Sequence, residues 1–143
     1  MISEQLKIYK RTKDFAVRLL EITKNLDKFT RGVVGTDMMQ ITMRELIARI
    51  VRVNKQKSIE KRIEELDEFI INLETVKAYL RVLSDAREIS LNNMAELSSF
   101  TDDIGKQATG WKKYLNDTLK NGKKEFTENE LNNEIPSGYK IIK

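Results

Sequence analysis

The sequence predicts an all-α protein, an up-down-up-down antiparallel four-helix bundle over residues 1–121 with a C-terminal tail. The single proline lies at position 136, so the preceding residues lack the strongest helix breaker. Apolar residues recur at helical spacing in four stretches, and the short connections between them make consecutive helices antiparallel neighbours. With 143 residues, 40% of them hydrophobic, the chain is long enough for one domain with a continuous core.

The first predicted helix carries one apolar stripe, whose members recur at steps of seven, four and three residues. They are Ile8, Phe15, Leu19, Ile22, Leu26 and Phe29. The segment from Thr30 to Thr36 then holds two glycines, so we expect a break there, with Thr36 or Asp37 as the N-cap of the second helix. The stripe of that second helix comprises Met39, Met43, Leu46, Ile50 and Val53.

Two longer stripes predict the third and fourth helices. The third stripe contains Ile59, Ile63, Leu66, Ile70, Leu73, Val76, Leu80 and Leu83. The fourth contains Leu91, Met94, Leu97, Ile104, Ala108, Trp111, Leu115 and Leu119. Ser58 and Ser90 stand directly before these stripes and are the expected N-caps, while Gly122 marks the end of the fourth helix.

Residues 122–143 differ in composition from the four stripes. The segment is polar and holds a Pro-Ser-Gly turn near its end, which favours a flexible extension over a packed segment. Its last five residues, 139–143, are unusually apolar for a free tail, so a docking peptide is the alternative interpretation.

The chain lacks the residue types on which most catalytic centres depend. It contains no His and no Cys, which excludes histidine bases, imidazole-bound zinc, thiolate nucleophiles and disulfides. Gly32 and Gly35 do not form a phosphate-binding loop. Glu60, Glu64 and Glu68 share a helical face, but a solvated acidic face explains them better than a metal site. We therefore expect a binding protein with no catalytic residues, no metal and no cofactor.

The distribution of apolar residues also bears on where the protein acts. The first residues have no apolar run of signal-peptide length, and the longest uncharged run, residues 89–95, is too short to cross a bilayer. Together with the absence of Cys, these features predict a soluble, cytoplasmic protein that does not enter membranes.

The net charge of +4 is unevenly distributed. Residues 1–28 carry seven basic and four acidic groups and residues 29–57 carry six and two, whereas residues 58–90 carry five and eight. Candidate phosphate contacts are Arg44, Arg49, Arg52 and Lys55 on the second helix and Lys77 and Arg81, four residues apart, on the third. The alternative is that these cations are solvated or paired within the chain. No aromatic platform interleaves with the basic residues, which argues against base stacking on single strands.

Gly105 and Gly110 lie inside the pattern of the fourth helix, where each glycine costs about 1 kcal/mol relative to alanine. Close approach of another backbone would explain this cost, because Gly105, Ala108 and Thr109 form a smooth face. The neighbour is either a helix of the same bundle or another subunit. Trp111 is correspondingly a core or an interface anchor. The candidate subunit interface therefore consists of Gly105, Ala108, Gly110 and Trp111.

Three stretches together resemble a known family. They are FTRGVVG at residues 29–35, LETVKAYLRVLSDAREIS at residues 73–90 and DIGKQATGWKKYL at residues 103–115. In this order they resemble the Avd proteins, the accessory variability determinants of diversity-generating retroelements, over about residues 6–118. Four-helix proteins encoded in intervening sequences of large-subunit rRNA genes are similar too, but their Asn-Ile-Ala-Glu-Gly end of the second helix is replaced by IVRVNKQ at residues 50–56.

The resemblance implies a homopentamer of four-helix subunits that associates with the reverse transcriptase of the retroelement. It further implies binding of RNA or DNA and support of mutagenic cDNA synthesis from template RNA, without catalysis by the protein itself. Lys77 and Arg81 match basic positions of the family's third helix, and Arg31 matches its loop arginine. The alternative is an oligomeric protein-interaction scaffold of the intervening-sequence type with no direct nucleic-acid role.

Overall fold

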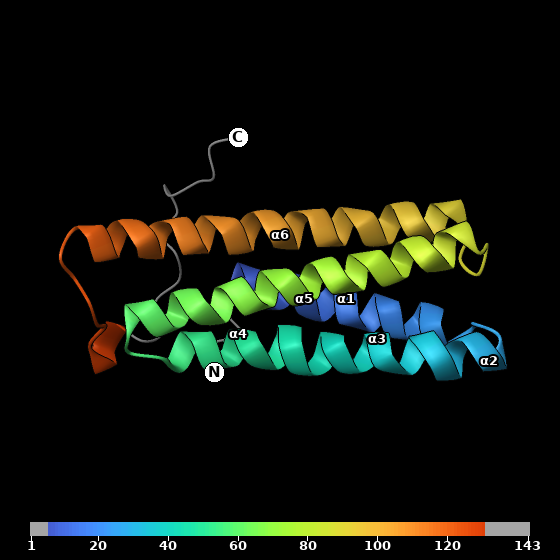
Figure 1. The fold of residues 1–143 in the computed structure, drawn as a ribbon, viewed down its shortest axis with the longest axis horizontal. Coiled ribbons are helices and arrows are strands. Elements are labelled where there is room, and N and C mark those ends of the chain that lie inside the picture. Colours follow the sequence, from blue (N-terminus) through green and yellow to red (C-terminus); the bar gives the residue numbers. More distant parts are fainter. Residues whose placement is uncertain (1–5, 131–143) are drawn as a thin grey trace.

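The computed structural model describes residues 6–130 as four long antiparallel helices that pack side by side (Figure 1). The first is α1 (Lys7–Lys24), the third is α5 (Ile59–Asp85) and the fourth is α6 (Leu91–Lys120). The second is a continuous helical run of α2 (Lys28–Thr30), η2 (Arg31–Gly35), α3 (Thr36–Ile41), η3 (Thr42–Ile47) and α4 (Ala48–Lys55). Helix α1 packs against α6 and this second helix, and α5 packs against α4 and α6, which confirms the predicted bundle.

The predicted boundaries of α5 and α6 are confirmed. The side chains of Ser58 and Ser90 accept hydrogen bonds from the backbone N–H groups of Lys61 at 3.3 Å and Asn93 at 3.0 Å. Helix α6 ends at Lys120, and Gly122 adopts a left-handed conformation with φ of 93°, which favours glycine. These N-caps and this stop are local signals, so they can be read without knowledge of the tertiary structure.

The second helix begins earlier than the sequence predicts, and neither Thr36 nor Asp37 caps it. Asp27 is the N-cap, and its carboxylate accepts a hydrogen bond from the backbone N–H of Thr30 at 3.1 Å. The expected break is instead a helical segment, η2, with wide π-type turns. Gly35 permits close packing there, because a Cβ atom at this position would lie 2.7 Å from Cγ2 of Thr23 in α1.

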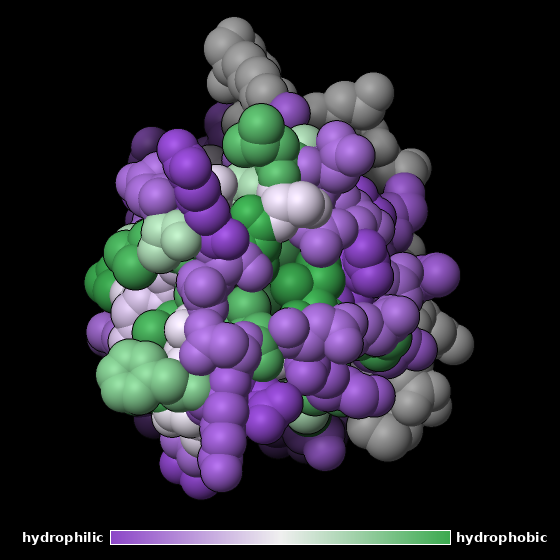
Figure 2. Space-filling view, turned by 90° about the vertical axis from the view of Figure 1, so that its right-hand side faces the viewer, coloured by the Kyte–Doolittle hydropathy of each residue, from purple (hydrophilic) through white to green (hydrophobic). Residues whose placement is uncertain are grey.

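The early start of the second helix also moves Phe29 out of the predicted core. The residue lies in α2 and is 77% exposed. Phe29 lies at the end of the bundle where α2 and the connection between α5 and α6 are found. At this end hydrophobic surface lies among hydrophilic side chains (Figure 2). Val33 and Val82 are further exposed apolar residues of the helices that end here.

The wide turns of η2 and η3 change which side chains of the second helix face the core. Met38, Thr42, Leu46 and Ile50 are buried, each four residues from the next, and Val53 is buried as predicted. A helix wound more widely than 3.6 residues per turn keeps such positions on one face. The predicted members Met39 and Met43 are half-buried and exposed, because the prediction assumed regular α-helical turns.

The core otherwise follows the predicted stripes, with polar additions. Helix α5 also buries Phe69 and the charged Arg62, and α6 also buries Thr101. Leu91 is exposed because it is the first residue of α6. Ile63, Ile70, Met94 and Leu119 are partly buried at the margin of the core.

Residues 122–130 pack against the start of α5. The backbone N–H of Phe126 donates to the Lys57 carbonyl at 2.9 Å, and that of Ile59 donates to the Lys124 carbonyl at 2.9 Å. Phe126 is buried beneath the Arg62 guanidinium, whose Cζ lies 4.5 Å from the ring centroid. The expected flexible extension from residue 122 therefore does not describe residues 122–130, because Phe126 completes the core. The apolar residues 139–143, considered above as a docking peptide, lie outside the described residues.

Candidate nucleic-acid interface

The predicted basic residues occupy two separate parts of the bundle. Because the second helix and α5 are antiparallel, Arg49 meets Glu65 near one end, whereas Asp37 meets Tyr79 farther along, with a hydrogen bond of 2.5 Å from the tyrosine hydroxyl. Arg49 follows Asp37 by twelve residues, which is about 18 Å along a helix. Arg49 and its neighbours are therefore several turns away from Lys77 and Arg81.

Two of the predicted cations on the second helix are paired with acidic residues of the chain. Arg49 donates to Glu65 at 2.9 Å and also pairs with Glu45, and its side chain is only 13% exposed. Desolvation by burial opposes the charged form, but these two carboxylates outweigh it and raise the pKa of Arg49. Nε of Arg52 lies 3.7 Å from the same Glu65 carboxylate. Glu65 thus reduces the positive charge that both arginines present to a ligand.

Arg44 and Lys55 present their charges to solvent. Both residues are exposed, and neither forms an ion pair with another residue of the described range 6–130. They are the members of the second-helix set that can contact phosphate without first breaking an intramolecular salt bridge.

Lys77 and Arg81 lie one turn apart on α5 but have different surroundings. Nζ of Lys77 lies 3.3 Å from the Glu74 carboxylate and 3.9 Å from that of Asp102 in α6, and the side chain is 25% exposed. Arg81 is exposed, and within residues 6–130 it has no salt-bridge partner. Arg81 is therefore the projecting cation, whereas Lys77 bridges two helices.

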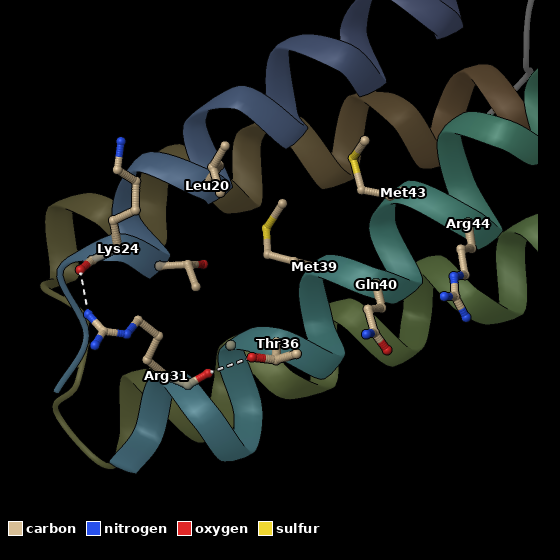
Figure 3. A pocket seen from close by; sticks show the side chains of 10 residues that line it. Leu20, Lys24, Arg31, Thr36, Met39, Gln40, Met43 and Arg44 are labelled. Atoms are coloured by element: carbon tan, nitrogen blue, oxygen red, sulfur yellow. Dashed lines mark hydrogen bonds between the residues drawn. The ribbon is translucent and has the colours of Figure 1, made fainter. Parts of the chain in front are cut away.

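A third group of cations, which the sequence interpretation did not bring together, surrounds a groove between α1 and the second helix (Figure 3). Lys24 comes from α1, and Arg31 and Arg44 come from the second helix. Arg31 is helical rather than in a loop, and its guanidinium donates to the Lys24 carbonyl at 3.2 Å. Spacing along the chain gave no signal for this group, because it depends on how the two helices pass each other.

The candidate subunit-interface residues are packed within the single chain. Ala108, Gly110 and Trp111 are buried in α6. A Cβ atom at Gly105 would lie 3.6 Å from a Leu73 methyl group of α5, an ordinary contact distance. Gly105 and Ala108 thus lie against their own bundle, whereas Thr109 is exposed, and a role of these residues in subunit contact stays a prediction.

Two further features of the described residues concern metal sites and membrane spans. Within residues 6–130, no group of three or more acidic side chains is placed to hold a metal ion. None of the helices described there combines the length and the apolar character that crossing a bilayer requires. Fold and surface together define a four-helix-bundle protein whose charged side chains, within residues 6–130, are partly paired and partly exposed to solvent.

Comparison with known proteins identifies the family of this four-helix-bundle protein. The chain belongs to the bAvd-like family, whose family model matches residues 6–115. This match confirms the Avd resemblance and places the chain among generally non-catalytic accessory proteins. Neither a curated protein nor a solved structure gives a significant match to the chain.

Proposed function

We propose that this chain is an accessory subunit of a diversity-generating retroelement, which binds RNA or DNA and associates with the reverse transcriptase. In that role it supports mutagenic copying of template RNA into cDNA and catalyses no step itself. The observation that carries this proposal is the bAvd-like family match over residues 6–115. The assembly expected by resemblance to Avd proteins is a homopentamer.

The surface charges indicate which side chains serve the nucleic acid. Arg81, Arg44 and Lys55 are exposed and carry the principal phosphate contacts. Lys77 adds to the charge beside Arg81, although its partners Glu74 and Asp102 weaken its contribution. Arg49 and Arg52, which Glu65 holds, contribute mainly to the local positive potential.

Salt-titrated binding of labelled single-stranded RNA and duplex DNA tests the nucleic-acid role. The double variant Lys77→Ala/Arg81→Ala should bind more weakly than the natural protein, because two cations near phosphate are lost. Each lost phosphate contact should reduce the slope of log affinity against log salt by about 1. Lys61→Ala/Lys106→Ala, which removes two exposed lysines elsewhere, is the matched control. Binding without salt dependence, equal for both double variants, would contradict the proposal.

Association with the polymerase is tested separately. We expect the protein to co-purify with the reverse transcriptase and to increase mutagenic cDNA synthesis when added to polymerase and template RNA. Omitting the protein, or replacing it with an unrelated four-helix bundle, is the control. Equal cDNA yield and equal substitution frequency with and without the protein would contradict the accessory role.

One observation favours the alternative of a protein-interaction scaffold. Three of the six cations predicted to contact phosphate are engaged with carboxylates of the same chain, namely Arg49, Arg52 and Lys77. A scaffold would co-purify with protein partners yet show no salt-dependent affinity for RNA or DNA. The titration described above therefore separates the two functions.

A further inference from the structure

The groove between α1 and the second helix has an apolar floor and a cationic rim. Its volume is about 390 Å³, and Leu20 of α1 and Met39 and Met43 of the second helix supply the floor (Figure 3). Leu20 is 48% and Met43 is 50% exposed, so the floor is open to a ligand. Lys24 and Arg31 flank one end of the groove and Arg44 the other, and none of the lining residues is acidic.

Nearby carboxylates compensate this positive charge only in part, because the strongest interactions of each lie elsewhere, although Glu45 also attracts Arg44. Asp37 follows the lining residue Thr36 but accepts its hydrogen bond from Tyr79 of α5, on the other side of the helix. Glu45 follows Arg44 but pairs with Arg49. The hydroxyl of Thr23, a buried lining residue, has no hydrogen-bond partner within residues 6–130.

We infer that this groove binds an acidic, amphipathic helical segment of a partner polypeptide. Arg31 and Arg44 are thirteen residues apart, which would be about 20 Å in a regular α-helix and is less here because η2 and η3 are wound more widely, so a partner helix of about three turns spans the distance between them. The apolar face of such a helix covers the leucine and the two methionines, whose flexible side chains adapt to an incoming surface. Acidic side chains at its two ends face the cations of the rim, which is the charge complementarity that selects this partner.

Other occupants fit the groove less well. A nucleic acid would find cations at the rim but no aromatic side chain among the lining residues on which a base could stack. Residues 131–143 of the chain contain two lysines and one glutamate, so their charge has the wrong sign for this rim. The apolar floor carries the inference, and Arg81 and Lys55 do not line it, so Arg44 is the member of the proposed phosphate contacts that the groove shares.

Fluorescence anisotropy with a designed peptide tests the inference on the full-length protein. The probe is a fluorescein-labelled helical peptide of about fourteen residues, with leucines at i, i+3, i+4 and i+7 spacing and glutamates elsewhere. A scrambled peptide of the same composition is the control ligand. We expect binding of the helical peptide, weakened by salt, and little binding of the scrambled one.

Two variants locate the binding surface. Met43→Glu should weaken peptide binding about tenfold or more, because it places a carboxylate where the peptide's leucines would pack, and the peptide's glutamates repel it. Ile71→Glu is the matched control, since Ile71 is a similarly exposed apolar residue, at 58%, on α5. Lys24→Glu/Arg44→Glu should weaken binding and remove its salt dependence, whereas Lys61→Glu/Lys106→Glu should leave both unchanged.

Several outcomes would overturn the inference. One is an absence of peptide binding at about 1 mM peptide, and another is equal weakening by Met43→Glu and Ile71→Glu. A loss of RNA affinity in Met43→Glu with peptide affinity unchanged would assign the groove to nucleic acid instead. A lower assembly mass of Met43→Glu in light scattering would assign it to a second copy of the chain.

Discussion

The contrast between Gly32 and Gly35 offers a quantitative test of how the second helix packs. Both glycines lie in η2, and a Cβ atom at Gly32 would have no neighbour within 4 Å, whereas one at Gly35 would lie 2.7 Å from Cγ2 of Thr23. Replacing glycine by alanine inside a helix stabilises it by about 1 kcal/mol. Gly32→Ala should therefore raise the free energy of unfolding by about that amount.

Gly35→Ala gains the same helix propensity but introduces a methyl group into occupied space. Thr23 is β-branched and buried, so its Cγ2 has little freedom to move away. Overpacking of this kind costs about 1–3 kcal/mol. The net change should lie between neutral and about 2 kcal/mol destabilising. The free energies of unfolding of the two alanine variants should thus differ by about 1–3 kcal/mol, although each variant adds a single methyl group and the two positions are only three residues apart.

Urea unfolding followed by far-UV circular dichroism measures this difference, at one fixed protein concentration because assembly affects apparent stability. Thr23→Ser removes the methyl group that the new Cβ would meet, so it should be less harmful in the Gly35→Ala background than in the natural protein. A double-mutant cycle gives that coupling energy. Equal stabilisation by Gly32→Ala and Gly35→Ala, or no coupling with Thr23→Ser, would refute the close approach of α1 to η2.

Two further predictions concern the C-terminal segment and the start of the second helix. Phe126→Ala should lower the free energy of unfolding by about 3 kcal/mol, because Phe126 is buried against the Arg62 guanidinium. In the same urea titration the control Phe29→Ala, at an exposed phenylalanine, should change the free energy of unfolding by less than about 0.5 kcal/mol. Asp27 has a pKa of about 2, lowered by hydrogen bonding with the Glu88 carboxyl and then by bonds from Thr30. The ionised Asp27 carboxylate therefore contributes stability above the ordinary pKa of 3.8, and this contribution is lost as the pH falls through about 2. Asp27→Asn should consequently reduce the acid sensitivity of thermal unfolding between these pH values. An unchanged pH profile would contradict this prediction.

The sequence predicted the four helices because their determinants are local. Ser58 and Ser90 were identified as N-caps from the residue type and its place before an apolar stripe, and both are confirmed. The start of the second helix was missed because glycine signals both turns and close packing. Gly35 serves the second purpose, and only the position of Thr23 in α1 reveals it.

The candidate site was less predictable, because a sequence shows which side chains are charged but not which charges are neutralised. Arg49 is paired with Glu65, sixteen residues away, and Lys77 lies near Asp102 on another helix. Neither pair follows from helical spacing within one element. The groove was missed for the same reason, since its cations come from two helices whose register only the fold defines.

Arg44 connects the two proposed ligands. It belongs to the exposed cations assigned to phosphate and also to the rim of the groove, whereas Arg81 lies on α5 and does not line the groove. A bound acidic helix would neutralise Arg44 and leave Arg81 accessible. Saturation with the designed peptide should therefore reduce the salt slope of RNA binding by about one phosphate contact in the natural protein. The same addition should have no effect in Arg44→Ala, whose RNA affinity already lacks that contact. An equal effect of the peptide on both proteins would show that the two ligands do not share Arg44.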